Sequence, residues 1–318
     1  MTTATKVWLI IAASLCLLGI IIFGGIIAMA NFDLSMLSTS KYTTNEHIIT
    51  DSFSDIDISS NTADIDLIPS DDGKCRIVCY EEENARHAVS VNNGVLSVKV
   101  VNEKKWYQYI GIYSGTPKVS VYLPEDEYGA LTISGSTGSI DIPDNFSFGD
   151  VSVTLSTGRI GYYADSKDLT LTATTGDITA GGIACKDTSL SVSTGSITAS
   201  DIECTSLFTK VTTGKTNISD VKCESFISKG NTGDIVLERL VSTGDIAIDR
   251  STGDVKLSDC DGSEIKISTD TGDVYGSLLS EKVFITSSDT GDINVPKTTT
   301  GGKCEITTDT GDIEIEIN

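Results

Sequence analysis

The residues of this sequence best suited to chemistry are aspartates that recur after a Thr-Gly pair. They occupy seven positions: Asp177, Asp234, Asp245, Asp254, Asp273, Asp292 and Asp312. Carboxylates repeated at the bends of a β-structure can bind Ca²⁺, as in nonapeptide β-rolls, or can accept hydrogen bonds from local backbone N–H groups. Nonapeptide rolls need doubled turns, whereas most bends here carry one aspartate, and four carry Ser139, Arg159, Ser196 or Lys215 instead. We therefore expect turn capping and no cofactor, with a calcium-dependent surface β-roll as the alternative.

Three cysteines, Cys185, Cys204 and Cys223, follow one another at intervals of 19 residues. In stacked coils they would form a column with Cα atoms about 4.8 Å apart, which is within disulfide range. Stacked side chains point in parallel, however, so they suit neither the disulfide dihedral nor a converging zinc site. We expect a buried, reduced cysteine ladder, and one disulfide or a metal site is the alternative.

Enzyme activity is a remote alternative, because parallel β-helices include carbohydrate-active enzymes that use carboxylates on one face. Catalytic sites stand out as departures from a repeat, but the acids here recur at equivalent bends. The two histidines, His47 and His87, lie outside the repeats, and no serine or cysteine sits in a recognisable nucleophile motif. We therefore predict a protein that is not an enzyme.

One dense aromatic cluster is present, and it lies outside the repeats beside two lysines. Its aromatic residues are Trp106, Tyr107, Tyr109 and Tyr113. This cluster is either a binding patch for a protein, a glycan or the membrane interface, or a cap over the open end of an apolar core.

The Thr-Gly pair is the organising feature of the chain. Eleven of its glycines are Gly138, Gly158, Gly176, Gly195, Gly214, Gly233, Gly244, Gly253, Gly272, Gly291 and Gly311. Apart from Gly244, which divides one unit, they recur every 18 to 20 residues. A period of about 19 residues indicates a solenoid, and the glycine suits a bend that needs a positive φ or a close approach of the neighbouring coil.

Each repeat unit reads as strand, turn and strand, with a third short stretch. Apolar side chains alternate at Leu169, Leu171 and Ala173 before one Thr-Gly pair, and at Ile178 and Ala180 after it. Strands this short cannot form an independent sandwich, and no helical pattern separates them. Residues 132–318 are therefore predicted to form a right-handed parallel β-solenoid in which successive units stack as coils.

The N-terminus carries a membrane-spanning signal. From Val7 to Ala30 the chain has 24 residues without a charge, more than the roughly 20 that a transmembrane helix needs. Cleavage as a signal peptide after Ala28-Met29-Ala30 is the alternative, although the usual apolar run there is only about 7–15 residues. Lys6 precedes the span, so we expect residues 1–6 in the cytoplasm, a single-pass anchor at 7–30 in the cell membrane, and the repeat domain outside the cytoplasm.

Two further segments separate the anchor from the repeats. Residues 31–47 are polar without periodicity and are predicted to be a linker, whereas residues 48–131 are expected to form an irregular β region that caps the solenoid. Beyond residue 30 the chain has 22 basic and 45 acidic side chains, a formal charge of −23. Such a charge disfavours nucleic acid and favours cationic peptides or other envelope proteins as partners, unless it serves solubility alone.

The irregular strands, the element VSVYLP at 119–124 and the repeated Thr-Gly-Asp-Ile units resemble the DUF4097 family over residues 48–318. Members are β-strand-repeat proteins of bacterial envelopes, often labelled adhesins on provisional grounds. The resemblance implies a solenoid-like β-fold and a surface or envelope role, and it supplies no catalytic residues. We expect a non-catalytic, membrane-anchored binding or scaffold protein, adhesive or linked to envelope stress.

Overall fold

The computed structural model describes residues 2–29, 41–104 and 115–318. Helix α1 (Thr3–Met29) is 27 residues long, and none of its residues is buried. It is long and apolar enough to cross a membrane, a property that it shares with N-terminal signal sequences. The predicted apolar span is therefore helical, and the helix begins four residues before Val7.

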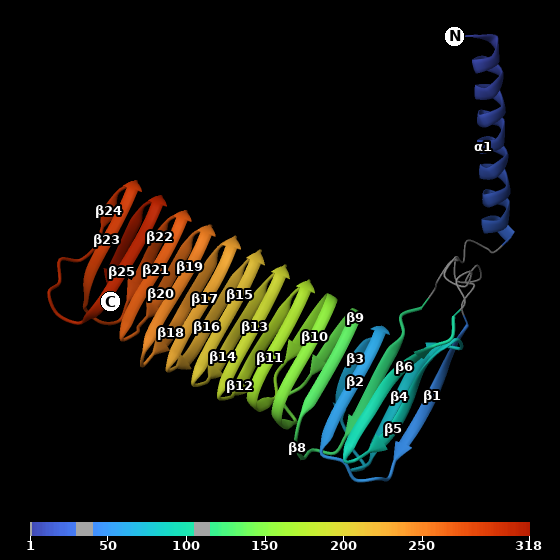
Figure 1. Ribbon diagram of the computed structural model, residues 1–318, viewed down its shortest axis with the longest axis horizontal. Helices are drawn as coiled ribbons and strands as arrows, with labels where there is room; N and C mark the ends of the chain where they lie inside the picture. Colours follow the sequence, from blue (N-terminus) through green and yellow to red (C-terminus); the bar gives the residue numbers. More distant parts are fainter. Residues whose placement is uncertain (1, 30–40, 105–114) are drawn as a thin grey trace.

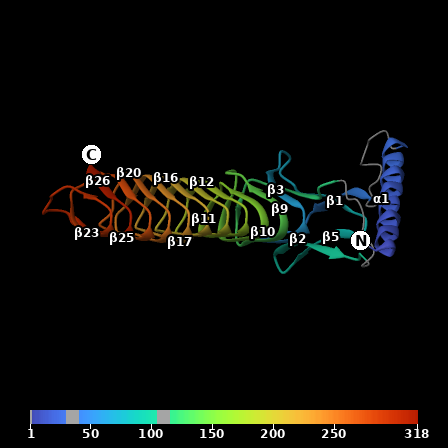
Figure 2. The same ribbon diagram turned by 90° about the horizontal axis from the view of Figure 1, so that it is seen from above.

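The remaining described chain is almost entirely β-strand, coiled into a long rod (Figures 1 and 2). The N-terminal β region consists of β1 (Tyr42–Ile49), β2 (Asp55–Thr62), β3 (Asp64–Pro69), β4 (Cys75–Glu82), β5 (Ala85–Asn92), β6 (Val95–Asn102), β7 (Lys118–Leu123) and β8 (Glu127–Tyr128). The rod continues through β9 (Leu131–Ile142), β10 (Ser147–Tyr162), β11 (Asp165–Thr175), β12 (Ile178–Ala184), β13 (Asp187–Thr194), β14 (Ile197–Glu203), β15 (Ser206–Thr213), β16 (Thr216–Cys223) and β17 (Ser225–Thr232). It ends with β18 (Ile235–Ser242), β19 (Asp245–Thr252), β20 (Val255–Cys260), β21 (Glu264–Thr271), β22 (Val274–Leu278), β23 (Lys282–Thr290), β24 (Ile293–Asn294), β25 (Gly302–Thr310) and β26 (Ile313–Ile317).

Most coils of the rod consist of two strands that meet at a Thr-Gly corner, as β13 and β14 do at Gly195. Leu190 and Val192 are buried before the corner, and Ile197 and Ala199 are buried after it. Because side chains alternate between the two faces of a strand, these positions line the interior, and the residues between them face outward. The alternation in the sequence therefore creates the apolar core of the rod.

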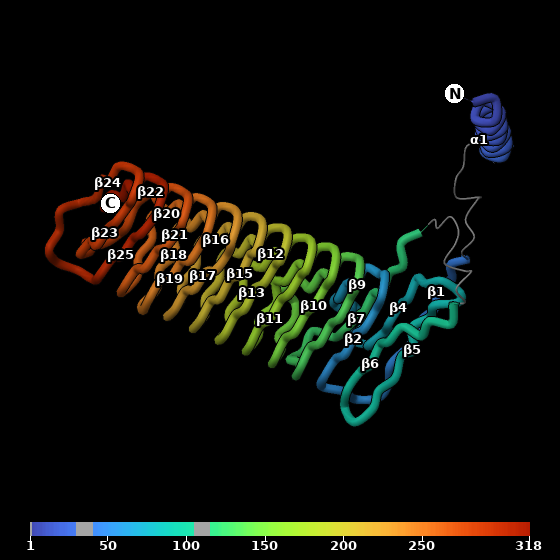
Figure 3. Tube along the Cα trace, turned by 45° about the horizontal axis from the view of Figure 1, so that its top comes forward, coloured from blue at the N-terminus to red at the C-terminus, as the bar shows by residue number. Residues whose placement is uncertain are grey.

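Successive coils pair in parallel and in register. One ladder aligns Leu171 of β11 with Leu190 of β13, and the ladder on the other side aligns Ile178 of β12 with Ile197 of β14. Equivalent residues of neighbouring repeats consequently stack in columns along the rod (Figure 3). This confirms the predicted parallel β-solenoid, while its right hand stays a prediction.

The third short stretch of each repeat is not a separate strand. It continues the second strand past a bend at one residue with a left-handed backbone, and these residues form a second column. Their φ angles are 66° at Gly182, 56° at Asp201, 55° at Asp220, 51° at Arg239 and 53° at Asp259. Aspartate tolerates this conformation because its short polar side chain can bond locally, so the bend needs no glycine and carries no glycine signal.

The C-terminal coil does not occupy the end of the rod, contrary to the expectation that units stack in chain order. Strand β25 lies between β21 and β23, and β26 lies between β22 and β24 (Figure 1). The physical reason is the quality of the core. The inward positions of the inserted coil are more apolar, since its Ile306 lies opposite Thr286 of the outer coil. The coil with the more apolar interior thus packs between two other coils, and the coil with the less apolar interior covers the end of the rod.

The N-terminal β region contains the first coil of the solenoid. Strand β2 pairs in parallel with β9, aligning Ile56 with Leu131, and β3 aligns Ile65 with Ile140. The corner between them reads Thr62-Ala63-Asp64-Ile65, so alanine replaces the glycine of the repeat. Beyond these strands the pairing becomes mixed, because β4 runs antiparallel to both β1 and β7, and β5 runs antiparallel to β6.

The expected linker at 31–47 is wrong for its last residues. Strand β1 begins at Tyr42 and pairs with β4 in eight-residue register, from Tyr42 opposite Glu82 to Ile49 opposite Cys75. The Tyr42 ring stacks on Tyr80, with ring centroids 5.2 Å apart. Cross-strand pairing and aromatic stacking therefore order a polar segment that lacks an apolar period of its own.

Glycine is required at the corners for two reasons. The φ angle is 137° at Gly195 and between 122° and 153° at the other repeat corners, whereas Gly244 is not among the glycines with positive φ. A Cβ at Gly195 would also lie well under 3.0 Å from the carbonyl oxygen of Gly176 in the preceding coil. Only glycine satisfies both conditions.

We predict that Gly195→Ala lowers the free energy of unfolding by about 2–4 kcal/mol, because it combines a strained φ with a backbone clash. The measurement is chemical denaturation followed by circular dichroism. Gly182→Asn is the matched control, since Gly182 has a φ of 66° with nothing within 4 Å of a Cβ, and the equivalent Asp201 already has this backbone. Equal effects of the two substitutions would contradict the role of close packing at the corner.

Candidate functional site

The corner aspartates form a hydrogen-bonded ladder between coils. The Oδ1 atom of Asp254 accepts a hydrogen bond from the backbone N–H of Asp273 at 2.9 Å. The Oδ1 atom of Asp273 accepts one from the backbone N–H of Asp312 at 2.8 Å. Asp312 in turn accepts the N–H of Asp292 at 2.8 Å, so the ladder follows the order of coils in space. Each of these carboxylates therefore caps the next corner, and its second oxygen is not part of the ladder.

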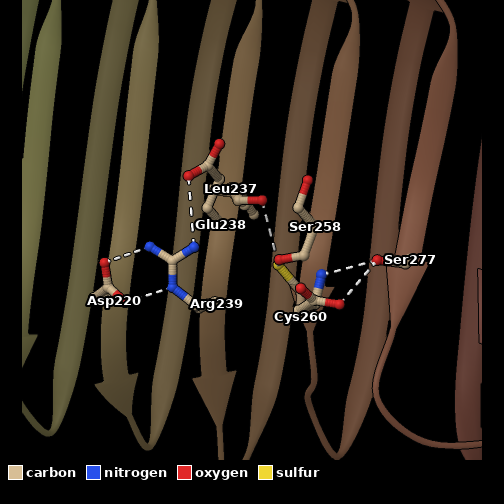
Figure 4. Close-up of polar contacts among 8 residues, drawn as sticks. Asp220, Leu237, Glu238, Arg239, Ser258, Cys260 and Ser277 are labelled. Carbon is tan, nitrogen blue, oxygen red and sulfur yellow. Dashed lines mark hydrogen bonds and ion pairs between the residues drawn. The ribbon is translucent and has the colours of Figure 1, made fainter. Parts of the chain in front are cut away.

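The second column, at the left-handed bends, is also mainly acidic. Arg239 interrupts it and donates from Nε and Nη2 to the two carboxylate oxygens of Asp220, both at 2.6 Å, while Glu238 lies 3.8 Å from Nη1 (Figure 4). The hydrogen bonds from Arg239 hold the pKa of Asp220 below its ordinary value. On the next coil, Ser277 accepts the backbone N–H of Asp259 at 2.9 Å. The Arg239 contacts are exposed, so they order the bend more than they stabilise the rod.

The three stacked cysteines are free thiols, and their environments differ. Cys204 and Cys223 are buried, whereas Cys185 is half-buried and its sulfur lies 2.7 Å from the Thr188 hydroxyl. A hydrogen bond with the Cys204 thiol lowers the pKa of Cys185, because it stabilises the thiolate, and the same interaction raises the pKa of Cys204. Burial raises the pKa of Cys223. The cysteine ladder therefore ends in a half-buried thiol whose pKa is lowered.

The aromatic cluster at Trp106, Tyr107, Tyr109 and Tyr113 lies outside the described residues. The binding-patch and cap interpretations of this segment both stay predictions. The described residues on either side of it, Lys104 and Gly115, line a cavity of about 340 Å³ in the N-terminal β region.

This cavity brings polar and charged side chains together with apolar ones. Besides Lys104 and Gly115, it is lined by Tyr42, Ser60, Asn61, Thr62, Glu82, Ala85, His87, Val100, Asn102 and Pro117. The Lys104 ammonium pairs with the Glu82 carboxylate at 2.5 Å. The cavity opens where β2 and β6 separate, because their pairing ends at Ser59 and Lys99.

A chain of buried polar groups lies along one side of the cavity. The Ser60 Oγ is 3.1 Å from His87 Nε2, and His87 Nδ1 is 2.8 Å from Glu81 Oε2. The same Glu81 oxygen accepts the backbone N–H of His87 at 2.6 Å, and its other oxygen accepts the Asn45 amide at 2.6 Å. Ser60, His87 and Glu81 are 4%, 6% and 1% exposed. Carboxylate and imidazole are therefore held rigidly, and the ring is placed to accept a proton from Ser60.

Cys79 lies beside these buried polar groups. The possible ligand atoms of Cys79, Glu81 and His87 are within 4.8 Å of one another. These residue types can bind a transition metal. Burial and the neighbouring Glu81 raise the pKa of Cys79 to about 12, however, so its thiol resists becoming a ligand. Glu81 and both ring nitrogens of His87 are also already hydrogen-bonded, so the described geometry fits a proton relay better than a metal centre.

The sequence interpretation missed this constellation, although a signal was present. Ser60 continues the inward register of Ile56 and Ile58, and Glu81 continues that of Cys79. Polar residues at positions where the alternation demands apolar ones mark a departure from the fold's own rule. The corner glycines, by contrast, lie where they were predicted and are structural.

Comparison with known protein families gives a match over the β-strand part of the chain. The family described as Toastrack DUF4097 matches residues 53–274 and 199–318. No curated protein matches the chain.

Several solved structures are similar at low identity. A "putative adhesin" from Bacteroides fragilis is 15% identical, with a TM-score of 0.44, covering 87% of this chain and 97% of that one. A "putative adhesin" from Parabacteroides distasonis is 11% identical, with a TM-score of 0.49 and coverage of 88% and 98%. A "putative lipid binding protein" from the same species is 12% identical, with a TM-score of 0.36 and coverage of 88% and 98%. Similarities this distant transfer no ligand to the present chain.

We predict that Cys185 reacts with iodoacetamide at least about tenfold faster than Cys204 or Cys223, because its lowered pKa provides more thiolate near neutral pH. Mass spectrometry of the folded protein over a pH series measures this order, and Cys185 should begin to react at the lowest pH. Cys304 is the buried control, since burial raises its pKa to about 12. Faster modification of Cys204 would contradict the assigned direction of the hydrogen bond.

Proposed function

Because this chain belongs to the Toastrack DUF4097 family, we propose that it is a membrane-anchored envelope protein whose solenoid rod is a non-catalytic binding surface outside the cytoplasm. The apolar helix α1 would hold the chain in the membrane, and the rod would present its columns to a partner. Adhesion, or a part in the response to envelope stress, would be the use of such a surface.

The observation that carries the proposal is the corner column of aspartates. Asp234, Asp254, Asp273, Asp312 and Asp292 follow one another in space at the spacing of the coils, about 4.8 Å. The carboxylates of the first four accept a backbone N–H from the next corner, so a partner loses less side-chain entropy in binding them. The column is therefore an extended negative stripe on a rigid support, suited to a cationic peptide or a basic segment of another envelope protein.

We predict that polylysine binds the rod weakly and in a salt-dependent manner. Exposed ion pairs contribute only about 0–1 kcal/mol each, so affinity requires several at once. Binding should fall steeply as the Debye length shrinks from about 10 Å at 0.1 M salt to about 3 Å at 1 M. Changing Asp234, Asp254, Asp273 and Asp292 to Asn should reduce the affinity progressively, as titration calorimetry can measure.

The control for this experiment changes net charge by the same amount elsewhere. Asp51, Asp71, Asp126 and Asp144 are exposed residues outside the column, and their change to Asn should leave most of the affinity. Asparagine retains an oxygen that can cap the next corner, so the column variants should keep their stability. If both sets of substitutions weaken binding equally, net charge and not the column attracts the peptide.

A separate prediction concerns topology. Protease added to intact cells should remove the rod while α1 stays in the membrane fraction, because we propose that the anchor is retained and the rod lies outside. Detection uses one tag at each end of the chain. A soluble mature protein beginning near residue 31 would instead mean that the Ala28-Met29-Ala30 site is cleaved.

A further inference from the structure

We propose that Ser60, His87 and Glu81 form a nucleophile, base and orienting acid that hydrolyse small esters in the cavity of the N-terminal β region. This activity goes beyond the binding role of the rod and occupies a different part of the chain. The proposal stands on the geometry of three buried side chains and on the cavity that Ser60 and His87 line.

The hydrogen bonds define the role of each group. Glu81 accepts from His87 Nδ1, so the neutral ring carries its proton there and leaves Nε2 free to accept the proton of Ser60. Donors from Asn45 and from the His87 backbone hold both Glu81 oxygens, which orients the carboxylate toward the ring. A serine, a base and an oriented acid in such contact are recognised by geometry on unrelated folds.

The cavity supplies access and a donor for the developing oxyanion. Asn61 follows the nucleophile in the chain and lines the cavity where the pairing of β2 with β6 has ended, so its backbone N–H is the oxyanion donor of the proposal. It lies next to the nucleophile, as an oxyanion donor must. About 340 Å³ accommodates a short acyl group with its alcohol.

The proposed hydrolysis consumes only the ester and one water molecule. Ser60 Oγ forms a bond to the acyl carbon while its proton passes to His87 Nε2, and the imidazolium remains paired with Glu81. The ester C–O bond then breaks, and the leaving alcohol takes the proton from Nε2. Water attacks the acyl-serine with His87 again accepting a proton, which returns to Ser60 Oγ as the acid departs.

A purely structural role does not explain the constellation well. Ser60 stands in the inward register of Ile56 and Ile58, where a branched apolar side chain would avoid the desolvation of a hydroxyl, an imidazole and a carboxylate. The group also lies in the part of the solenoid where the repeat breaks down. The unlike residues that such a site needs are brought together there.

The test uses the full chain in detergent with a fluorophosphonate probe and p-nitrophenyl acetate. We expect one covalent adduct, mapped by peptide mass spectrometry to Ser60, and ester hydrolysis that falls roughly 10³-fold in Ser60→Ala. Glu81→Gln should slow both reactions while the thermal melt shows the chain still folded. Ser120→Ala is the matched control, because Ser120 is a buried serine of β7 outside the network, and it should change neither reaction.

Three results would overturn the proposal. They are an unlabelled folded wild-type chain at millimolar probe, an adduct mapped to another serine, or equal hydrolysis by wild type and Ser60→Ala. If Ser60→Ala does not fold, the mapped adduct on the wild-type chain decides alone. Polylysine binding by the rod does not depend on any of these outcomes, so the two functions succeed or fail separately.

Discussion

The close approach of backbone at the Thr-Gly corners is the constraint on which the rest of the structure depends. A Cβ at Gly176, Gly195 or Gly214 would lie well under 3.0 Å from the carbonyl oxygen of the preceding corner glycine. Such contact admits no slippage between coils, because a shift of one residue would bring a side chain into it. The corners thus set the register, and the strands on both sides inherit it.

Strict register stacks like residues on like, which creates an electrostatic problem that the fold resolves locally. Aspartates one coil apart would repel one another, but in the corner column the carboxylates of Asp254, Asp273 and Asp312 each accept a backbone N–H of the next coil. In the bend column the guanidinium of Arg239 spans the two oxygens of Asp220. The acidity of the chain is therefore compatible with its stacking, and the same pairing leaves carboxylate oxygen available at the surface.

Much of the rod could be predicted from sequence, because the residues that each coil requires recur in every repeat. The period of the Thr-Gly pair and the alternation around it were sufficient for the parallel coils and their corners. The first corner was not predicted because Ala63 replaces the glycine. Alanine is tolerated at this corner because no glycine corner of an earlier coil packs against it. The bends at Asp201 and Asp220 escaped notice because aspartate adopts the left-handed backbone without a glycine signal.

Other features could not be predicted because they depend on contacts between unlike residues far apart in the chain. Arg250 is 1% exposed inside the rod, and burial lowers its pKa to about 10. It donates to Thr216 at 2.8 Å and to Ser228 at 3.2 Å, and the space for it exists because Gly230 has no side chain. The order of the last two coils depends likewise on which of them has the more apolar interior. Neither repeat shows this when it is considered alone.

The same logic explains where chemistry can arise in this molecule. A repeat offers the same side chains in the same surroundings at every coil, which suits broad and multivalent recognition but not the convergence of a nucleophile, a base and an acid. In this molecule the antiparallel strands β4, β5 and β6 provide that convergence beside the first coil. Glu81 at the end of β4 and His87 in β5 meet Ser60 of β2 only because the antiparallel strands pack against the parallel ones. The departure from the repeat is therefore the structural condition for the site.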